Sequence, residues 1–260
     1  MAHRNQSAAR GDYGLDAPVL VRGFLLGGAA LIALGIGVRA WMRARLVTIA
    51  WGMLVCTGAV FIFEGLLMIW SSRVGKFHER DALLDGLRLR GDETVLDVGP
   101  GHGLLLIGAA RRLPHGRAVG IDLWSQADQA DNSRDALLAN ARLAEVDERV
   151  EVHDGDMREL PFADGGFDAV MASLAIHNIH DRAGRDLAIR EIMRVLRPGG
   201  QVALLDFQHT SEYAEMLRAA GMRDVQLSRL SFWMFPPVRT VTAVKPRLTI
   251  PPASDTIRSR

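Results

Sequence analysis

The chain has 260 residues, of which 48% are hydrophobic and 23% charged. Its 31 basic and 30 acidic residues leave a formal net charge of +1, so no single-sign field favours binding to nucleic acid. The only cysteine, Cys56, excludes an intramolecular disulfide and a cysteine-based zinc site.

Two long apolar segments lie within the first 70 residues, at 19–38 and 46–70. At a rise of about 1.5 Å per residue, each is long enough to cross a hydrocarbon layer of roughly 30 Å. We therefore predict a flexible tail over residues 1–18, followed by two transmembrane helices that form a hairpin. A cleaved signal peptide is disfavoured because a second, longer apolar segment follows the first. A buried hairpin of a soluble protein and a shallow hairpin in one leaflet stay open.

Two charged residues interrupt these segments. Arg22 lies near the start of the first and Glu64 near the end of the second, so antiparallel helices would hold both at a similar depth. A lone charge costs about 2.5–3.5 kcal/mol at the centre of a bilayer and less near its surface. We predict an ion pair between them, with separate snorkelling to the headgroups as the alternative.

The pattern changes after a linker and lead-in helix over residues 71–93. Strands are predicted at 94–98, 118–122, 150–153, 168–173, 201–207, 224–230 and 239–244. Helices are predicted at 104–113, 134–144, 182–196 and 211–220. Five of the strands are apolar runs without alternation, as expected for strands covered on both faces. This order predicts a doubly wound α/β domain over residues 94–246, followed by a tail over 247–260.

A glycine motif follows the first predicted strand. The strand carries Asp97, and glycines then occupy alternate positions at Gly99, Gly101 and Gly103. Glycine lets the backbone turn sharply and lie against a ligand, and the following helix offers free N–H groups. A nicotinamide dinucleotide site is the rival interpretation, but it would have G-x-G-x-x-G spacing. A carboxylate beside the glycines also suits an ammonium group better than a pyrophosphate.

Further acids follow the next two predicted strands. Asp122 ends its strand, with Leu123 beside it, where a carboxylate can accept hydrogen bonds from a ribose diol. Trp124 is then placed to stack on an adenine ring. After the third strand, Asp156 can accept from an adenine amine while the Met157 N–H donates to a ring nitrogen. These positions describe a nucleoside site.

The run from residue 95 to residue 207 resembles the class I S-adenosylmethionine-dependent methyltransferases. It carries their glycine motif, their two acidic positions, an F-D-A-V strand at 167–170 and an L-R-P-G-G turn at 196–200. The resemblance implies a Rossmann-like sheet of seven strands, the last antiparallel, and S-adenosyl-L-methionine as the cofactor. The residues expected at the cofactor are Asp97, Gly99, Gly101, Gly103, Asp122, Leu123, Trp124, Asp156, Met157 and Ser173.

The cofactor also orients the hairpin. Because S-adenosylmethionine is cytosolic, we expect a multi-pass protein of the cell membrane whose catalytic domain is cytoplasmic. The loop residues Arg39, Arg43 and Arg45 oppose this orientation by the positive-inside tendency, so the cofactor and not the charge count decides. The hairpin also offers a surface for forming a homo-oligomer.

The acceptor is expected over the ends of the fourth and fifth strands. His177 and Asn178 follow the fourth strand, and we predict that they are catalytic, with His177 as the general base. A purely structural role for His177 is the alternative. Asp181 is expected to cap the helix over 182–196. No ligand spacing supports a metal site formed by His177, His180 and His209.

Two loops keep open interpretations. In the first, Asp128, Gln129 and Asn132 either line a lid of the site or lie in solvent. The aromatic segment 231–237 either packs on the domain, dips into the membrane or covers an apolar acceptor. The predicted function is methyl transfer to a lipophilic small molecule or a membrane-associated lipid. A small thiol or volatile acceptor, and a non-catalytic cofactor-binding membrane module, remain alternatives.

Overall fold

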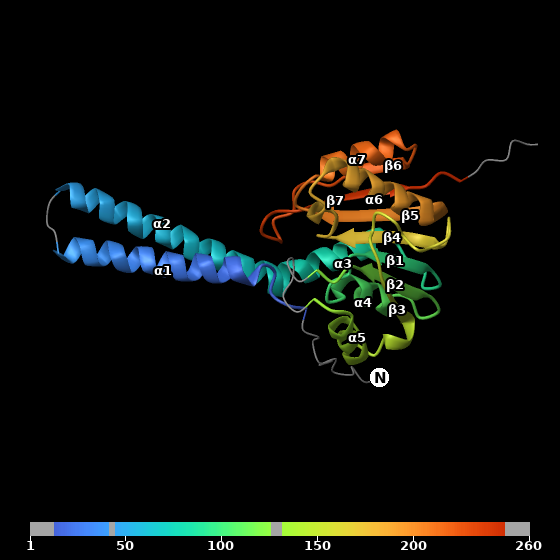
Figure 1. The fold of residues 1–260 in the computed structure, drawn as a ribbon, viewed down its shortest axis with the longest axis horizontal. Coiled ribbons are helices and arrows are strands. Elements are labelled where there is room, and N and C mark those ends of the chain that lie inside the picture. Colours follow the sequence, from blue (N-terminus) through green and yellow to red (C-terminus); the bar gives the residue numbers. More distant parts are fainter. Residues whose placement is uncertain (1–12, 42–44, 126–131, 248–260) are drawn as a thin grey trace, which may run out of the picture.

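The computed structural model describes residues 13–41, 45–125 and 132–247. A helical hairpin projects from an α/β domain (Figure 1). The hairpin and its extension comprise α1 (Pro18–Trp41), α2 (Arg45–Trp70), a π-helical turn (Ser71–Gly75) and α3 (Lys76–Gly86). The remaining α-helices are α4 (Leu104–Arg111), α5 (Arg134–Leu143), α6 (Arg182–Val195) and α7 (Thr210–Ala219).

The domain is built on one seven-stranded sheet in the order β3-β2-β1-β4-β5-β7-β6. Its strands are β1 (Thr94–Val98), β2 (Arg117–Asp122), β3 (Val150–Asp154), β4 (Phe167–Ser173), β5 (Leu196–Asp206), β6 (Arg223–Leu227) and β7 (Arg239–Val244). β7 runs antiparallel to both β5 and β6, and the other pairs are parallel. The predicted doubly wound sheet with an antiparallel last strand is confirmed.

The ends of the elements differ from the prediction by a few residues, most of all in β5. This strand begins at Leu196, within the predicted turn, because Leu196 already pairs with Phe167 across an irregularity in β4. β6 ends at Leu227, where the chain leaves the sheet to form the aromatic segment. The sequence pattern predicts which segments form strands but not the residue at which the pairing between strands begins.

Each face of the sheet carries its own hydrophobic core. Side chains of α3, α4 and α5 pack on one face, and side chains of α6 and α7 pack on the other. Alternation along β1 shows the division, because Val95 belongs to the first core and Leu96 to the second. Strands that are buried on both faces need no polar positions, which explains their continuous apolar sequences.

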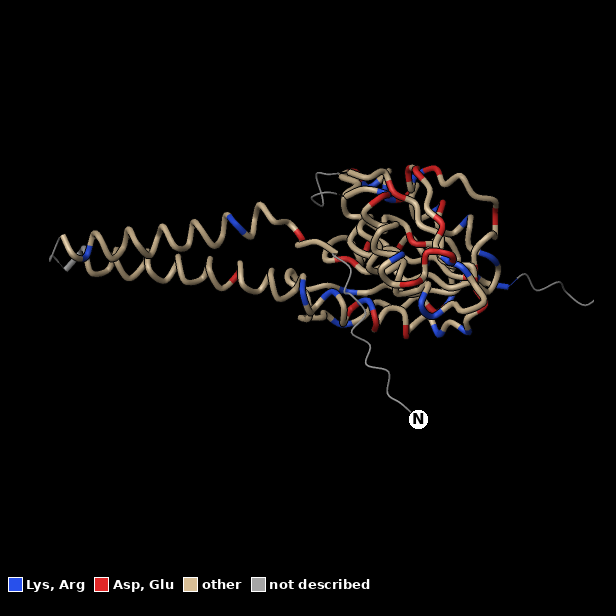
Figure 2. Tube along the Cα trace, turned by 90° about the horizontal axis from the view of Figure 1, so that it is seen from below, with Lys and Arg blue, Asp and Glu red and all other residues tan. Residues whose placement is uncertain are grey.

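Close glycine contacts hold the hairpin together. A Cβ atom added to Gly28 would lie 2.6 Å from the Gly58 carbonyl oxygen, and one added to Gly58 would lie 2.6 Å from the Gly28 oxygen. Phe24 and Phe61 pack edge to face beside this crossing, with ring centroids 5.5 Å apart. By length and composition, both hairpin helices are able to cross a membrane. Figure 2 shows that charged positions gather on the domain and are sparse along the hairpin.

The expected ion pair between Arg22 and Glu64 is absent from the described residues. The helices are antiparallel and Gly65 packs against Leu25, so Arg22 and Glu64 lie at similar levels along the hairpin. Arg22 is nevertheless exposed, on a part of α1 that does not face α2. Depth follows from residue number, whereas the direction of a side chain depends on which helix face the glycines bury.

The chain before α1 is bound to the domain from Tyr13 onward, although the sequence places it in a flexible tail. The Lys76 Nζ donates to the carbonyl oxygens of Tyr13 at 2.8 Å and Gly14 at 2.7 Å, and lies 3.4 Å from the Asp16 carboxylate. Asp16 also accepts from the Ser72 hydroxyl at 2.9 Å. This N-terminal strap, residues 13–17, therefore crosses the junction between hairpin and domain.

The aromatic segment packs on the same junction. The Trp233 ring stacks on His78 at 4.1 Å and on Trp70 at 5.6 Å. Gly75 allows this approach, because a Cβ there would overlap the Trp233 carbonyl group. Met234 is buried, while Phe232 is 74% exposed. The loop between β6 and β7 thus reaches the base of the hairpin (Figure 1).

Candidate active site

The glycine turn lies where β1 passes into α4. Gly99, Gly101 and Gly103 all have positive φ, at 75°, 53° and 86°, a conformation that favours glycine. At Gly99 a side chain is also excluded by space, since its Cβ would lie 2.5 Å from the Ala175 Cβ. The turn therefore presents backbone to the cavity above β1 and β4.

Asp97 lies beneath this turn, and its residue is only 1% exposed. Neither of its carboxylate oxygens accepts a hydrogen bond of ordinary geometry from the described residues, although the Leu106 N–H is close enough to oppose part of the rise in its pKa. Burial raises the pKa of Asp97 well above its usual range, and the nearby charge of Asp122 raises that pKa further. An unpartnered buried carboxylate beside a cavity fits a ligand with an ammonium group, which supplies the missing hydrogen bonds.

Asp122 is held rigidly at the end of β2. One carboxylate oxygen accepts from the Gly101 N–H at 3.0 Å, and the other accepts from the Trp124 N–H at 2.8 Å. Each oxygen keeps a further lone pair, so the carboxylate is able to accept two hydroxyl groups as well. Its position beside the glycine turn is the arrangement that a ribose diol requires.

The predicted adenine residues lie in the loop after β3. The Asp156 carboxylate is bound by Arg158, whose Nη2 lies 2.6 Å away, and this hydrogen bonding lowers the pKa of Asp156. Asp156 and Met157 both line the cavity. An adenine amine would therefore share this carboxylate with Arg158.

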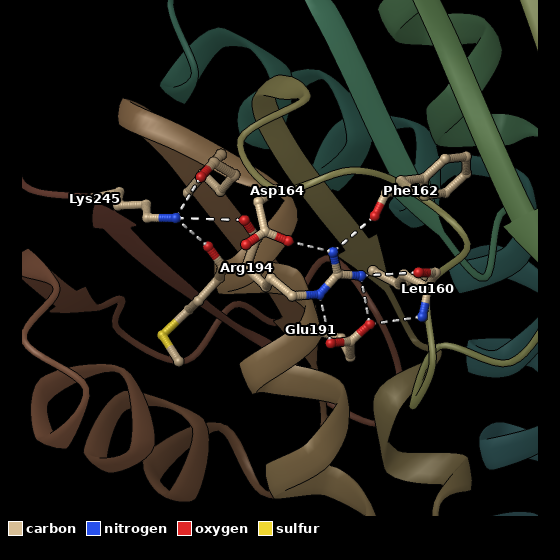
Figure 3. A network of polar contacts seen from close by, with 8 residues as sticks. Leu160, Phe162, Asp164, Glu191, Arg194 and Lys245 are labelled. Carbon is tan, nitrogen blue, oxygen red and sulfur yellow. Dashed lines mark hydrogen bonds and ion pairs between the residues drawn. The ribbon is translucent and has the colours of Figure 1, made fainter.

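A polar network fixes the far end of that loop (Figure 3). The Arg194 guanidinium donates to the carbonyl oxygens of Leu160 at 2.8 Å and Phe162 at 2.7 Å. It also binds Asp164 and Glu191, each at 2.8 Å, and its hydrogen bond to Glu191 raises the pKa of Arg194. One side chain from α6 thus ties down the segment that carries the expected adenine residues.

Most of the predicted cofactor residues line a single cavity of about 910 Å³. Those that line it are Asp97, Gly99, Gly101, Asp122, Leu123, Asp156, Met157 and Ser173. Gly103 does not line it and is instead the N-cap residue that precedes α4. Trp124 also lies outside it, and its indole N–H donates to Asp154 at 2.6 Å.

One further cavity residue was only an open possibility in the sequence. Asn132 is buried, lines the cavity, and has a side-chain oxygen without a hydrogen-bond partner among the described residues. Its amide donates to the Ser125 carbonyl at 3.3 Å. Asp128 and Gln129, which were considered with it, lie outside the described residues.

His177 lies in a short helical turn after β4, beside an acid that the sequence analysis did not single out. Its Nδ1 is 2.9 Å from the Asp206 carboxylate, although the contact lacks the geometry of an aligned hydrogen bond. Asp206 is 2% exposed and ends β5. His177 and Asn178 both line the cavity.

Asp206 is itself fixed by several donors. It accepts from the Phe207 N–H at 2.8 Å, the His177 N–H at 3.2 Å and the Tyr213 hydroxyl at 3.3 Å. Burial and the charge of Asp206 raise the pKa of Tyr213, so this hydroxyl stays a donor. The signal in the sequence was an acid at the end of an apolar strand, the same pattern that marked Asp122.

Asp181 caps α6 as predicted, since its side chain accepts from the Gly184 N–H at 2.7 Å. His180 lines the cavity near its mouth. Across the part of the chain that the structure describes, histidines, cysteines and acids form no group of three suited to a metal ion.

The cavity extends beyond the domain to the base of the hairpin. Its walls include Leu20 and Phe24 of α1, Met68 of α2 and Met234 of the aromatic segment. At about 910 Å³ it is near the upper end of the roughly 300–1,000 Å³ typical of ligand sites. It has a polar end at the glycine turn, and its other end combines these apolar side chains with Lys76, Glu79 and Arg80 of α3.

Comparison with known proteins agrees with this geometry. Residues 96–204 match the family model of a methyltransferase domain. A ubiquinone/menaquinone biosynthesis C-methyltransferase of Dinoroseobacter shibae is 34% identical over 131 residues, which cover 49% of this chain and 48% of that protein. The 27-O-demethylrifamycin SV methyltransferase of Amycolatopsis mediterranei is 37% identical over 127 residues, covering 49% of this chain and 43% of the relative. The chain thus matches about half the length of these curated relatives.

Solved structures share the fold of the domain. A methyltransferase dependent on S-adenosylmethionine from Aquifex aeolicus has a TM-score of 0.51 at 19% identity, over 64% of this chain and 89% of that one. A geranyl diphosphate C-methyltransferase of Streptomyces coelicolor, solved with S-adenosyl-L-homocysteine, has a TM-score of 0.51 at 16% identity, over 65% and 79% of the two chains. Residues 96–204 therefore match a methyltransferase domain, and the α/β domain around them has the fold of methyltransferases that depend on S-adenosylmethionine.

Proposed function

We propose that this protein transfers a methyl group from S-adenosylmethionine to a lipophilic acceptor, either a small molecule or a membrane lipid. The observation that supports this proposal is the single cavity that joins Asp97 and His177 to apolar side chains of the hairpin. A polar acceptor alone would leave those apolar walls in contact with water.

Asp97, Asp122 and the glycine turn are proposed to hold the cofactor. Asp97 faces the ammonium group, Asp122 accepts from the ribose hydroxyls, and Asp156 with Met157 borders the adenine. The cofactor supplies a methyl group on a positively charged sulfur. Because that methyl group is already activated, the protein mainly has to align the acceptor with it.

His177 is proposed as the general base. A nucleophilic atom of the acceptor forms a bond to the methyl carbon as the carbon–sulfur bond breaks, and the sulfur keeps the electron pair. The imidazole takes the proton that the acceptor loses, and Asp206 stabilises the resulting imidazolium at a distance of 2.9 Å. Asn178 lies beside it and would orient the acceptor.

The hairpin is proposed to sit in the cell membrane, with the domain on the cytoplasmic side, where the cofactor is made. Two features support this. The helices are long and apolar enough to span, and only 17% of the most apolar window of each is buried inside the protein. The core helices of a soluble protein are mostly buried.

The proposal is tested with the full chain in nanodiscs, incubated with cofactor carrying a labelled methyl group and with a total lipid extract. We expect label in the fraction that partitions into organic solvent, and at least about a hundredfold less with the His177→Ala variant. Label confined to water-soluble thiols or volatile products contradicts the lipophilic acceptor. If the protein binds the cofactor but transfers no methyl group to any component of several extracts, the non-catalytic membrane module is supported instead.

A further inference from the structure

We propose that the mouth of the cavity is a lateral portal, through which the acyl or isoprenoid chain of an acceptor enters directly from the bilayer. This inference rests on the proposed membrane location of the hairpin. It adds a binding site for a hydrocarbon chain and a route to it, neither of which follows from the methyltransferase fold alone.

The portal is defined by two segments far apart in the sequence. On one side lie Leu20 and Phe24, in the first two turns of α1. On the other lie residues 234–236 of the aromatic segment, which also line the cavity. Met68, near the end of α2, contributes to the wall between them.

The surface around the portal is apolar and exposed. Leu20 is 58% exposed although it lines the cavity, so it has one side in the cavity and one side outside. Phe232 and Trp233 extend this surface along the aromatic segment, and Trp233 stacks on Trp70 at the end of α2. The surface is therefore continuous with the hairpin itself. Exposed aromatic residues at the base of the hairpin are suited to the interface between a bilayer and water.

The other side of the mouth is closed by the N-terminal strap. Asp16 and Ala17 line the cavity, and the Lys76 and Ser72 side chains hold the strap in place. The residues of α1 and α2 that line the cavity, Leu20, Phe24 and Met68, are all apolar, and the charged lining residues Lys76, Glu79 and Arg80 lie in α3. A chain that is already dissolved in the bilayer pays no desolvation cost to reach Leu20 and Phe24.

The two ends of the cavity match the two ends of an amphiphile. The methyl-transfer end holds His177, Asn178 and Asp97, which suit a head group with a proton to lose. The portal end holds leucine, phenylalanine and methionine side chains. In a molecule with its tail toward the hairpin and its head toward β4, the tail contacts apolar side chains and the head contacts polar ones.

The portal is tested by photo-crosslinking in nanodiscs of phosphatidylcholine that contain a phosphatidylcholine with a diazirine at the end of one acyl chain. The full chain carries S-adenosylhomocysteine, and adducts are mapped by mass spectrometry. We expect adducts at mid-hairpin Leu34 and also at the hairpin end of the cavity, at the buried lining residues Met68 and Leu83.

Leu20→Trp should fill the portal and lower the interior adducts by about fivefold or more, with the Leu34 adducts unchanged. Leu26→Trp is the matched control, because Leu26 is an exposed residue of α1 that does not line the cavity. Retained S-adenosylhomocysteine binding shows that each variant is folded.

The outcomes separate the portal from the proposed function. Adducts at Leu34 with none at Met68 or Leu83 overturn the portal but leave the membrane location intact. Interior adducts that Leu20→Trp does not reduce also overturn this route. An absence of adducts at Leu34 overturns both the membrane location and the portal. Interior adducts in a protein that methylates no lipid support the portal and contradict the catalytic proposal.

Discussion

The hairpin and the α/β domain use apolar residues in opposite ways. In the domain, leucine, isoleucine and valine are buried in two cores against a sheet, and charged residues cover the outside. In the hairpin, apolar side chains such as Leu26, Leu34 and Phe63 are more than half exposed, and glycines form the contacts between the helices. The comparison shows that the domain carries its own solvent-excluded core, whereas the hairpin leaves most of its apolar surface exposed, as the proposed membrane location requires.

The largest expected effect is that of His177→Ala, which should change catalysis without changing the packing of the domain or of the hairpin. Its imidazole lies in the cavity and contributes to neither core, so turnover should fall by about 10²–10⁴-fold while cofactor affinity and thermal stability stay near wild type. Single-turnover methylation and calorimetry measure the two effects. Full activity in this variant would assign His177 a structural role and leave alignment as the whole mechanism.

A second change tests the polar end of the domain. Asp122→Ala removes the carboxylate assigned to the ribose, and the loss of charge-assisted hydrogen bonds costs on the order of 2–4 kcal/mol. Calorimetry should show S-adenosylhomocysteine binding weakened by about thirtyfold or more. Glu148→Ala, an exposed acid outside the cavity, is the control. Equal affinities for the two variants would refute the ribose assignment.

The independence of the hairpin from the domain is tested by adding a side chain where the two hairpin helices touch. Gly58→Val places a side chain against the Gly28 carbonyl oxygen, and overpacking of this kind costs about 1–3 kcal/mol. The separation of spin labels on α1 and α2 should increase, while the melting temperature of the domain and its cofactor affinity stay constant. Gly52→Val is the matched control, since nothing lies within 4 Å of its Cβ position. A lower melting temperature for the domain would mean that the two regions fold as one unit.

The smallest expected effect is the pH dependence of cofactor binding. The pKa of Asp97 is raised in the free protein by burial, so this group retains a proton above the usual carboxyl range. A bound ammonium group favours the ionised form, and binding should therefore release a proton. Affinity should rise with pH from about 4 up to the raised pKa of Asp97 and level off above it.

Calorimetry in buffers of different ionisation enthalpy measures that proton release. Asp97→Asn should bind more weakly and lose this part of the pH dependence. If the affinity of the wild type is flat with pH and no proton is released, Asp97 does not face the ammonium group.

The sequence predicted the sheet well because strands buried on both faces leave apolar runs without alternation, as at 169–172 in β4 and 202–205 in β5. The glycine turn was predictable for a similar reason, since positive φ values at Gly99 and Gly103 restrict the residue type. The pairing of His177 with Asp206 was not predictable. It depends on the register of β4 against β5, which brings together residues 29 positions apart.

Side-chain directions were the other limit. Trp124 was expected on the adenine but turns toward Asp154, because its backbone has a φ of +57° after Asp122. The strap was expected to be flexible, and only the fold shows that Lys76 lies where it binds two carbonyl groups of the strap. Such contacts join distant segments, so local pattern carries no information about them.

The π-helical turn at Ser71–Gly75 has a mechanical consequence. It joins α2 to α3 without a break, so one continuous helix from Arg45 to Gly86 runs from the hairpin into the domain. A π-turn inserts about one extra residue and rotates the downstream helix face by roughly 100°. That rotation, and not a flexible linker, sets which face of α3 meets the sheet. In a bilayer, any change in the tilt of α2 would therefore change the height and the orientation of the whole domain above the lipid surface. Because helix tilt depends on membrane thickness, that thickness would act on the position of the domain.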